Sequence, residues 1–318
     1  RNVMPQLRGR GAGFAGLRIQ SSRCLVFLLR ASSTCADAPA CSAADSLQSF
    51  TLLHKVPKSP DSFLLRFALA PGRRWLGDDP MLPTCIKVIS NGTKEGGSTP
   101  LEKSYSPVSH PATEQAVELL VKQYEPRPGG GVGAYLCGLA VGETMRATLK
   151  SKRMMHGDAS VNRRWANVGL LAGGTGIAPL LQIVRILLDD SEDRTRMKVL
   201  AVNRREEDIL MRDELDRLAT LHSDRLEITY SLTSPSDSWA GPTGRGSVAM
   251  ARAALPPPTA DGQTMVLVCG TDGFVASWAG PVIRGPKKAD GSKGPKIQGP
   301  LLGLLAEAGY DASEVFKY

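Results

Sequence analysis

The chain has 318 residues, of which 42% are hydrophobic and 22% are charged. This length exceeds the usual size of a single hydrophobic core, so we expect two domains and an added segment. No apolar run approaches the ~20 residues of a membrane-spanning helix, and we expect none. The formal net charge is +8, but six arginines and no acidic residue fall within positions 1–36. The excess charge is therefore local and does not indicate a basic face for nucleic acid.

The first segment, 1–48, has the composition of an organelle transit peptide. Its arginines are spaced through Gly, Ala, Ser and Leu, and the first acidic residue is Asp37. We expect a mitochondrial protein, in the matrix or associated with the inner membrane, with a plastid as the second choice. The alternative is a disordered basic tail that has no targeting function. If the segment is retained rather than cleaved, it buries too little of its own surface to become ordered alone. We hypothesise that it then lies against partner subunits.

Cysteines and histidines are isolated from one another along the chain, and no Cys-x-x-Cys pair occurs. Zinc sites and disulfide frameworks need repeated spacings of these residues. We therefore expect no metal centre and a reducing compartment. The residues concerned are Cys24, Cys35, Cys41, Cys85, Cys137 and Cys269, and His54, His110, His156 and His222.

The rest of the chain divides into two regions by its hydrophobic pattern. From 49 to 160, short strands separated by Gly and Pro predict a small antiparallel β-barrel. From 161 to 318, short apolar strands alternate with helices, which predicts an α/β doubly wound parallel sheet with its ligand at the carboxyl ends of the strands. The expected strands are 62–69, 85–89, 116–122 and 144–149, then 168–172, 197–202, 226–231 and 265–268, and the expected helices are 179–189, 208–221 and 247–254.

A glycine turn follows the first strand of the second region. It reads Gly-Gly-Thr-Gly-Ile-Ala-Pro over 173–179, between an apolar run and a helical pattern. Glycines let the backbone approach a diphosphate, and the helix N-terminus offers unpaired N–H groups. The spacing is neither Gly-x-Gly-x-x-Gly nor the P-loop. A nucleotide is the first ligand to consider, and the alternative is a structural turn that packs strand on helix.

Several further segments resemble the NADH-cytochrome b5 reductase branch of the ferredoxin-NADP reductase superfamily. The resemblance runs from about Ser49 to Tyr318 and implies an FAD-binding barrel followed by an NAD(P)-binding domain. The segments that carry it are 103–109, 118–124 and 129–136 in the first region, and 203–215, 267–274 and 309–318 in the second.

The resemblance implies a set of FAD-binding residues in the barrel. Tyr105 would pack on the flavin, and Ser106 would approach the flavin N5 as a catalytic residue. The further implied residues are Lys103, Pro107, Leu120, Lys122 and Tyr124, with backbone donors at Gly130, Gly131, Val132 and Gly133.

The chain departs from the family pattern at three places in this barrel. Lys103 replaces an arginine, and the two are not interchangeable at a phosphate. Gly131 and Gly133 replace a lysine and a hydroxyl residue, and a third change lies at 82–84. We therefore expect weakened FAD binding. The alternative for the glycine run is a flexible hairpin loop.

The second region matches the family pattern more closely. The turn Gly173, Gly174, Thr175, Gly176 to Pro179 would face the pyrophosphate and the nicotinamide, with Thr175 also near the flavin. Cys269, followed by Gly270, would lie near the hydride-carrying carbon. Asp208 would favour NADH, because a carboxylate repels a 2′-phosphate. Arg204 and Arg205 point toward NADPH, so NADH is only slightly favoured.

Two functions remain open. The first is an FAD-dependent NAD(P)H reductase that sends hydride to flavin N5 and single electrons to a haem or iron–sulfur acceptor. The second is a weakly catalytic or non-catalytic relative that serves as a structural subunit of a large mitochondrial respiratory complex, with or without a bound nucleotide. The basic loop 284–296 would dock an acidic acceptor or be plainly solvated. The C-terminal aromatic residues 316–318 would lie near the interdomain cleft or pack as an ordinary chain end.

Overall fold

The computed structural model describes residues 47–69, 85–93, 100–110, 113–125, 131–150, 163–287, 294 and 296–318. Every element below lies within Ser42–Tyr318. Nearly all of the transit-like segment, Gly130, the segment 82–84 and most of the loop 284–296 lie outside the described residues.

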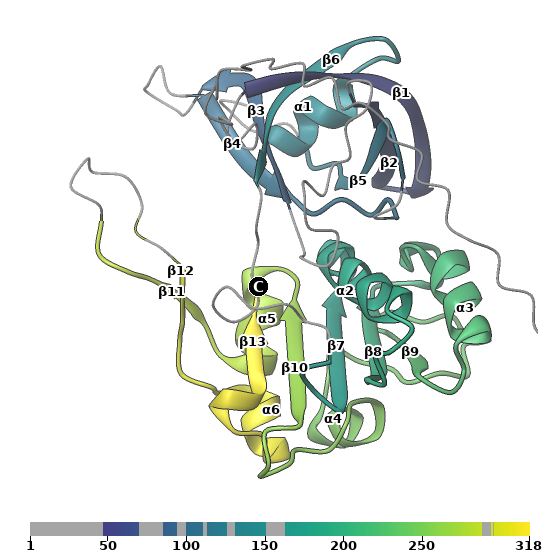
Figure 1. The fold of residues 1–318 in the computed structure, drawn as a ribbon, viewed down its shortest axis with the longest axis vertical. Coiled ribbons are helices and arrows are strands. Elements are labelled where there is room, and N and C mark those ends of the chain that lie inside the picture. Colours follow the sequence, from purple (N-terminus) through teal and green to yellow (C-terminus); the bar gives the residue numbers. More distant parts are fainter. Residues whose placement is uncertain are drawn as a thin grey trace, which may run out of the picture. The chain divides into compact units, whose positions relative to one another are not determined.

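The N-terminal region forms a six-stranded antiparallel sheet, as predicted. Its strand order is β4-β3-β6-β1-β2-β5 (Figure 1). Alternate residues such as Leu65 and Phe67 are fully buried inside it, which is the pattern of a sheet with one face on a core. The strands are β1 (Leu47–Ser59), β2 (Ser62–Ala68), β3 (Cys85–Thr93), β4 (Pro100–Tyr105), β5 (Ala116–Lys122) and β6 (Thr144–Lys150).

The segment after β4 brings the two edges of this sheet together. Pro107 forms an antiparallel bridge with Leu119 of β5. The Val108 N–H donates to the Glu118 carbonyl at 2.8 Å, and the Glu118 N–H donates to the Ser109 hydroxyl at 3.1 Å. The sheet therefore closes as a barrel at the segment that carries Ser106.

Helix α1 (Val132–Gly138) packs against β3, β4 and β5 and places Leu136 in the barrel core. It begins directly after Gly131. The hairpin-loop alternative for the glycine run is therefore wrong for Gly133, which lies inside the helix.

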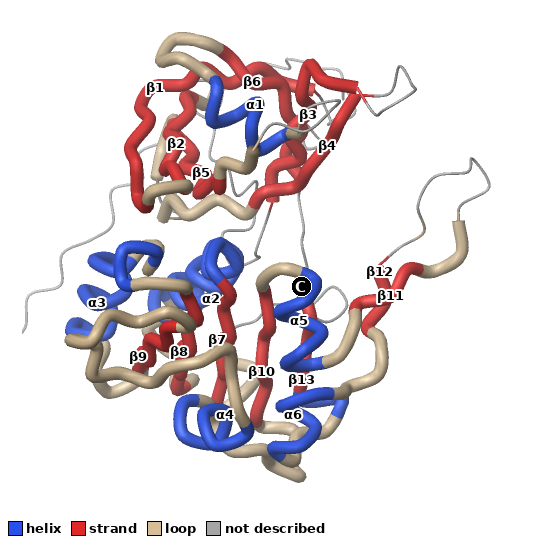
Figure 2. Tube along the Cα trace, turned by 180° about the vertical axis from the view of Figure 1, so that it is seen from behind, coloured by secondary structure: helices blue, strands red, loops and turns tan. Residues whose placement is uncertain are grey.

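The C-terminal region is a five-stranded parallel sheet with the order β13-β10-β7-β8-β9, as predicted (Figure 2). Leu170 and Leu171 are consecutive in β7 and belong to different core clusters, so both faces of the sheet are buried. Helices α2 and α3 contribute to one cluster, and α4, α5 and α6 to the other. The elements are β7 (Asn167–Gly173), α2 (Ile177–Asp189), β8 (Arg196–Asn203), α3 (Arg212–Leu221), β9 (Leu226–Leu232), α4 (Val248–Ala254), β10 (Thr264–Cys269), α5 (Asp272–Ala279), α6 (Gly303–Ala308) and β13 (Val315–Lys317).

Two helix boundaries differ from the prediction. Helix α2 begins at Ile177 and includes Pro179, which its first turn tolerates because a proline there gives up no intrahelical hydrogen bond. The helix predicted over 208–221 begins only at Arg212. Met211 has a left-handed backbone with φ of 59°, which a continuous helix cannot contain. Asp208 lies instead in a short 3-10 turn, Glu206–Asp208.

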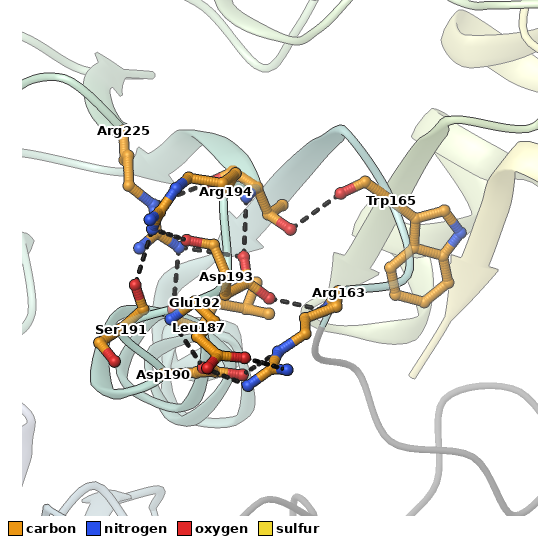
Figure 3. A network of polar contacts seen from close by, with 10 residues as sticks. Arg163, Trp165, Leu187, Asp190, Ser191, Glu192, Asp193, Arg194 and Arg225 are labelled. Atoms are coloured by element: carbon orange, nitrogen blue, oxygen red, sulfur yellow. Dashed lines mark hydrogen bonds and ion pairs between the residues drawn. The ribbon is translucent and has the colours of Figure 1, made fainter.

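A buried polar network anchors the start of the parallel sheet (Figure 3). The Asp193 side chain is fully buried and accepts from Arg225 at 3.0 Å, from the Thr195 N–H at 2.7 Å and from the Arg163 N–H at 2.6 Å. The Thr195 hydroxyl donates to the Trp165 carbonyl at 2.8 Å. The network thus ties the residues before β7 to the turn between α2 and β8. A separate ribbon, β11 (Val282–Arg284) and β12 (Lys296–Gln298), extends from the same domain.

Candidate active site

The glycine turn lies where the parallel sheet reverses its strand order, between β7 and β10. Gly174 has φ of +52°, and an added Cβ there would meet nothing within 4 Å. An added Cβ on Gly176 would lie 2.1 Å from the Cys269 carbonyl oxygen. Only glycine permits this approach, which brings Cys269 and Gly270 beside the turn as predicted. No side chain caps the N-terminus of α2 at Gly176. Its backbone donors therefore suit a phosphate.

A cleft of about 780 Å³ opens in front of this turn, and we call it the large cleft. Both domains supply its walls. The barrel contributes Ser59, Asp61, Ser62, Lys122 and Tyr124. The parallel-sheet domain contributes Gly173, Gly174, Thr175, Val202, Asn203, Arg204, Asp208, Leu210, Thr233, Arg245, Gly246, Thr271, Gly273, Phe274, Ser277 and Leu304.

A second hollow of about 330 Å³, the small hollow, lies against the start of α1. It shares Tyr124 with the large cleft. Its lining residues are Lys103, Tyr124, Glu125, Gly131, Val132, Gly133 and Ala134.

Two polar groups of the barrel fit an anionic, ring-bearing cofactor such as FAD. The Lys103 ammonium lies 5.4 Å from the ring centroid of Tyr105 and 5.6 Å from that of Tyr124. Burial lowers its pKa, so a phosphate there would relieve the cost of its desolvated charge. The Tyr105 hydroxyl is buried and has no hydrogen-bond partner among the described residues. Burial also raises the pKa of this phenol, which keeps it a donor.

Gly133 has a packing role that the motif comparison does not reveal. An added Cβ would lie 2.9 Å from the Lys122 carbonyl oxygen and within 3.7 Å of the Tyr105 hydroxyl. Gly131, in contrast, faces open space. Glycine at 133 therefore lets α1 approach β5 closely. Where the family has a hydroxyl residue at this position, the present backbone has no room for one.

The segment after Ser106 is held by helix α2, the helix that begins at the glycine turn. The Gln182 amide donates to the Pro107 carbonyl at 2.7 Å, and the Arg185 guanidinium donates to the Val108 carbonyl. Both side chains are buried, and Ser106 itself is only 7% exposed. Arg185 also pairs with Glu214 of α3 at 2.7 Å. One helix thus fixes the flavin motif and the nucleotide turn relative to each other.

Opposite charges gather where β8 ends at the large cleft. Arg204 pairs with Asp208 through two bonds, Nε to Oδ2 at 3.1 Å and Nη2 to Oδ1 at 3.0 Å. These bonds raise the pKa of Arg204. Arg205 is exposed and lies 3.6 Å from Glu207, and it is not among the residues that line the cleft. Of these two arginines, Arg204 is therefore the one that lines the cleft beside Asp208.

The structure places most predicted site residues at these two sites. Lys122, Tyr124, Gly173, Gly174, Thr175 and Asp208 line the large cleft, and Lys103, Gly131, Val132 and Gly133 line the small hollow. Tyr105 lies beside Lys103 and Gly133. Other predicted residues are not among those that line either site. Ser106, Pro107 and Leu120 are buried. The remaining residues lie in or beside the glycine turn: Gly176, Pro179, Cys269 and Gly270.

Three features of the site were not predicted. Asp61 follows β1 in a turn, and its charge alone gave no sign of a role. Gln182 and Arg185 read as polar positions on an amphipathic helix. Phe274 lies against the turn so closely that an added Cβ on Gly173 would be 2.8 Å from its ring.

The C-terminal aromatic residues are packed into the fold. Residues 315–317 form β13, which pairs with β10, and Tyr318 is buried in the core cluster with α2. The rings of Phe316 and Tyr318 meet edge to face at 5.4 Å. Neither residue is among those that line the large cleft.

Within the described residues, no group of three or more His, Cys, Asp or Glu side chains is arranged to hold a metal ion. No helix in the same part of the chain is both long and apolar enough to cross a membrane.

Comparison with known proteins agrees with this geometry. Residues 50–150 match the oxidoreductase FAD-binding domain, and residues 170–279 match the oxidoreductase NAD-binding domain. An NADH-cytochrome b5 reductase-like protein of Arabidopsis thaliana is 30% identical over 96% of this chain and 87% of its own length. NADH-cytochrome b5 reductase 2 of Mycosarcoma maydis is 30% identical over 86% of this chain and 73% of its own length.

A solved structure is also similar. The cytochrome b5 reductase domain of Ulva prolifera nitrate reductase superposes with a TM-score of 0.61 at 27% identity, over 72% of this chain and 89% of that domain. The two domain matches and the cleft between their binding motifs support FAD and NADH as the cofactors. The chain therefore belongs to the NADH-cytochrome b5 reductase family, within the ferredoxin-NADP reductase superfamily.

Proposed function

We propose that the protein is an active NADH-dependent reductase that passes electrons, one at a time, to a haem or iron–sulfur protein. The observation that carries the proposal is the large cleft. Lys122 and Tyr124 of the flavin-binding barrel line it together with Gly173–Thr175 and Asp208. FAD, when bound, accepts hydride from NADH and releases electrons singly. The protein's part in the reaction is to hold the nicotinamide and the flavin in the right geometry.

The chain's own residues supply that positioning. The glycine turn and the N-terminus of α2 bind the pyrophosphate of the nucleotide, and Thr175 lies at the cleft side of the turn. Gln182 and Arg185 hold the segment after Ser106, which fixes the barrel side of the cleft. Cys269 is half-buried beside the turn, where it orients the nicotinamide and needs no covalent step.

The acceptor is proposed from the names of the similar proteins, which are cytochrome b5 reductases; cytochrome b5 is a one-electron acceptor. We favour a b5-type haem protein over an iron–sulfur protein on this basis. For the location we propose the mitochondrion, on the composition of residues 1–48 alone, and import of a reporter fused to this segment into isolated mitochondria tests it.

The acceptor is tested by separating the two half-reactions under anaerobic conditions. Protein reduced by NADH is mixed with ferric cytochrome b5 or with an oxidised [2Fe–2S] ferredoxin, and haem or cluster reduction is followed spectroscopically. We expect rapid reduction of cytochrome b5. A Gly176→Val variant, whose side chain would collide with the Cys269 carbonyl, should lose reduction by NADH but still reduce cytochrome b5 after chemical reduction with dithionite. Transfer to neither acceptor from protein in the reduced state would favour the structural-subunit alternative.

A further inference from the structure

Asp61 lies in the turn between β1 and β2, on the barrel side of the large cleft. Its carboxylate is held from four directions. Oδ1 accepts from the hydroxyls of Ser59 at 3.2 Å and Ser62 at 3.0 Å. Oδ2 lies 2.7 Å from the Lys122 ammonium and 2.9 Å from Arg204 Nη2. Burial opposes its charge, but Lys122, Ser62 and Ser59 keep the pKa of Asp61 below its usual value.

The contact with Arg204 changes the charge that the nucleotide meets. The Arg204 guanidinium sits between two carboxylates, Asp208 from its own domain and Asp61 from the barrel. Together with Lys122 the group holds two positive and two negative charges, so it is formally neutral. Its four members all line the large cleft.

This cluster lies where the adenosine ribose is expected. In doubly wound domains the pyrophosphate binds at the turn after the first strand, and the ribose hydroxyls meet residues at the end of the next strand. Here that strand is β8, which ends at Asn203, directly before Arg204. A 2′-phosphate adds about two negative charges at this point. Such a phosphate would be attracted to Arg204, whose Nε and Nη2 already donate to the carboxylates of Asp208 and Asp61.

We infer that Asp61 is a positioning residue for cofactor choice: by holding Arg204 from the barrel side, it withholds that guanidinium from a 2′-phosphate and so favours NADH over NADPH. The inference rests on the nucleotide site of the proposed function, but its test measures nucleotide binding and does not depend on the electron acceptor. Asp208 binds Nε and Nη2 of Arg204, and Asp61 adds a second carboxylate at Nη2.

The test measures nucleotide binding by calorimetry on the FAD-loaded protein, with adenosine 5′-monophosphate and its 2′-phosphorylated form as probes. In Asp61→Asn, the 2′-phosphorylated probe should bind about tenfold more tightly, the ratio that 1.4 kcal/mol gives, while the other probe changes less than about twofold. The matched control is Glu207→Gln, which removes the same charge close to Asp208 but faces Arg205. It should leave both affinities unchanged.

The same substitution, made in a variant that lacks the Arg204 guanidinium, isolates the role of Arg204. In Arg204→Gln, the substitution Asp61→Asn should no longer improve binding of the 2′-phosphorylated probe. An improvement that persists there would mean that Asp61 acts by direct repulsion or through Lys122, and would overturn the inference. Equal changes for both probes would overturn it as well. Asp61→Ser, measured alongside, gives the same comparison if the asparagine variant loses its FAD.

Discussion

Replacement of Arg185 by Met tests whether helix α2 holds the flavin motif in place. Met keeps an unbranched apolar stem but removes the guanidinium. The Val108 carbonyl then loses its α2 donor, and Glu214 loses its buried cation. We expect a loss of stability together with slower reduction of the flavin by NADH, because Ser106 sits two residues before Val108.

The magnitude follows from the burial of the pair. The Arg185 side chain is 8% exposed and that of Glu214 is 22% exposed. Breaking a fully buried ion pair costs about 3–5 kcal/mol. Glu214 keeps Arg217 as a partner and some contact with water, so we expect about 2–3 kcal/mol from the unfolding free energy.

The assay is a double-mutant cycle by denaturant unfolding with Arg185→Met and Glu214→Gln. A coupling energy of about 1–3 kcal/mol is expected for residues in direct contact. Arg217→Gln is the matched control, since Arg217 is an exposed partner of the same carboxylate, and it should leave the midpoint nearly unchanged. A coupling below about 0.5 kcal/mol, or unchanged flavin reduction by NADH in Arg185→Met, would refute the reasoning.

Further predictions follow from single contacts. Arg217 and Arg185 hold the pKa of Glu214 below its usual value despite its burial. This carboxylate therefore contributes stability above its unfolded pKa that is lost as pH falls through its folded pKa, and Glu214→Gln should flatten that acid limb in pH-dependent melting. Lys103→Arg should tighten FAD binding about threefold to tenfold by equilibrium dialysis, because a guanidinium can grip phosphate through two bonds, and Lys103→Met should weaken it. Gly176→Ala should keep FAD but slow flavin reduction by NADH about 100-fold in stopped flow, since its Cβ would lie 2.1 Å from a carbonyl oxygen; an unchanged rate would contradict the close approach. Asp193→Asn should cost about 3 kcal/mol in unfolding experiments, whereas Glu192→Gln, at a side chain that is 71% exposed, should cost about 0.5 kcal/mol or less.

Hydrophobic pattern predicted the strands well where each strand reads clearly in isolation. The parallel strands are apolar runs bounded by turn residues, and β5 matches its expected limits from Ala116 to Lys122. Strand β1 escaped notice because Pro57 lies within it, and proline normally argues against a strand. Helix α1 escaped for a related reason. Gly133 and Gly138 have poor helix propensity, and the helix depends on burying Leu136 in the barrel.

In the site, too, features formed by neighbouring residues were predictable, and contacts between residues far apart in the sequence were not. The glycine turn was predictable because it consists of seven consecutive residues, 173–179, whose pattern is recognisable in the sequence alone. The hydrogen bond from Arg185 to the Val108 carbonyl was not predictable, since the two residues lie 77 positions apart in the sequence. Arg204 meets Asp61 across 143 positions. Such pairs become visible only once the two domains are folded.

The central claim is that this chain binds FAD and NADH at one cleft in a productive arrangement. The measurement that tests it most directly is an anaerobic titration of the purified, FAD-saturated protein with NADH, followed by the visible absorbance of the flavin. We predict stoichiometric FAD on the protein and complete bleaching by an equivalent of NADH. A protein that retains no FAD after saturation, or whose bound FAD is not bleached by excess NADH, would contradict the account.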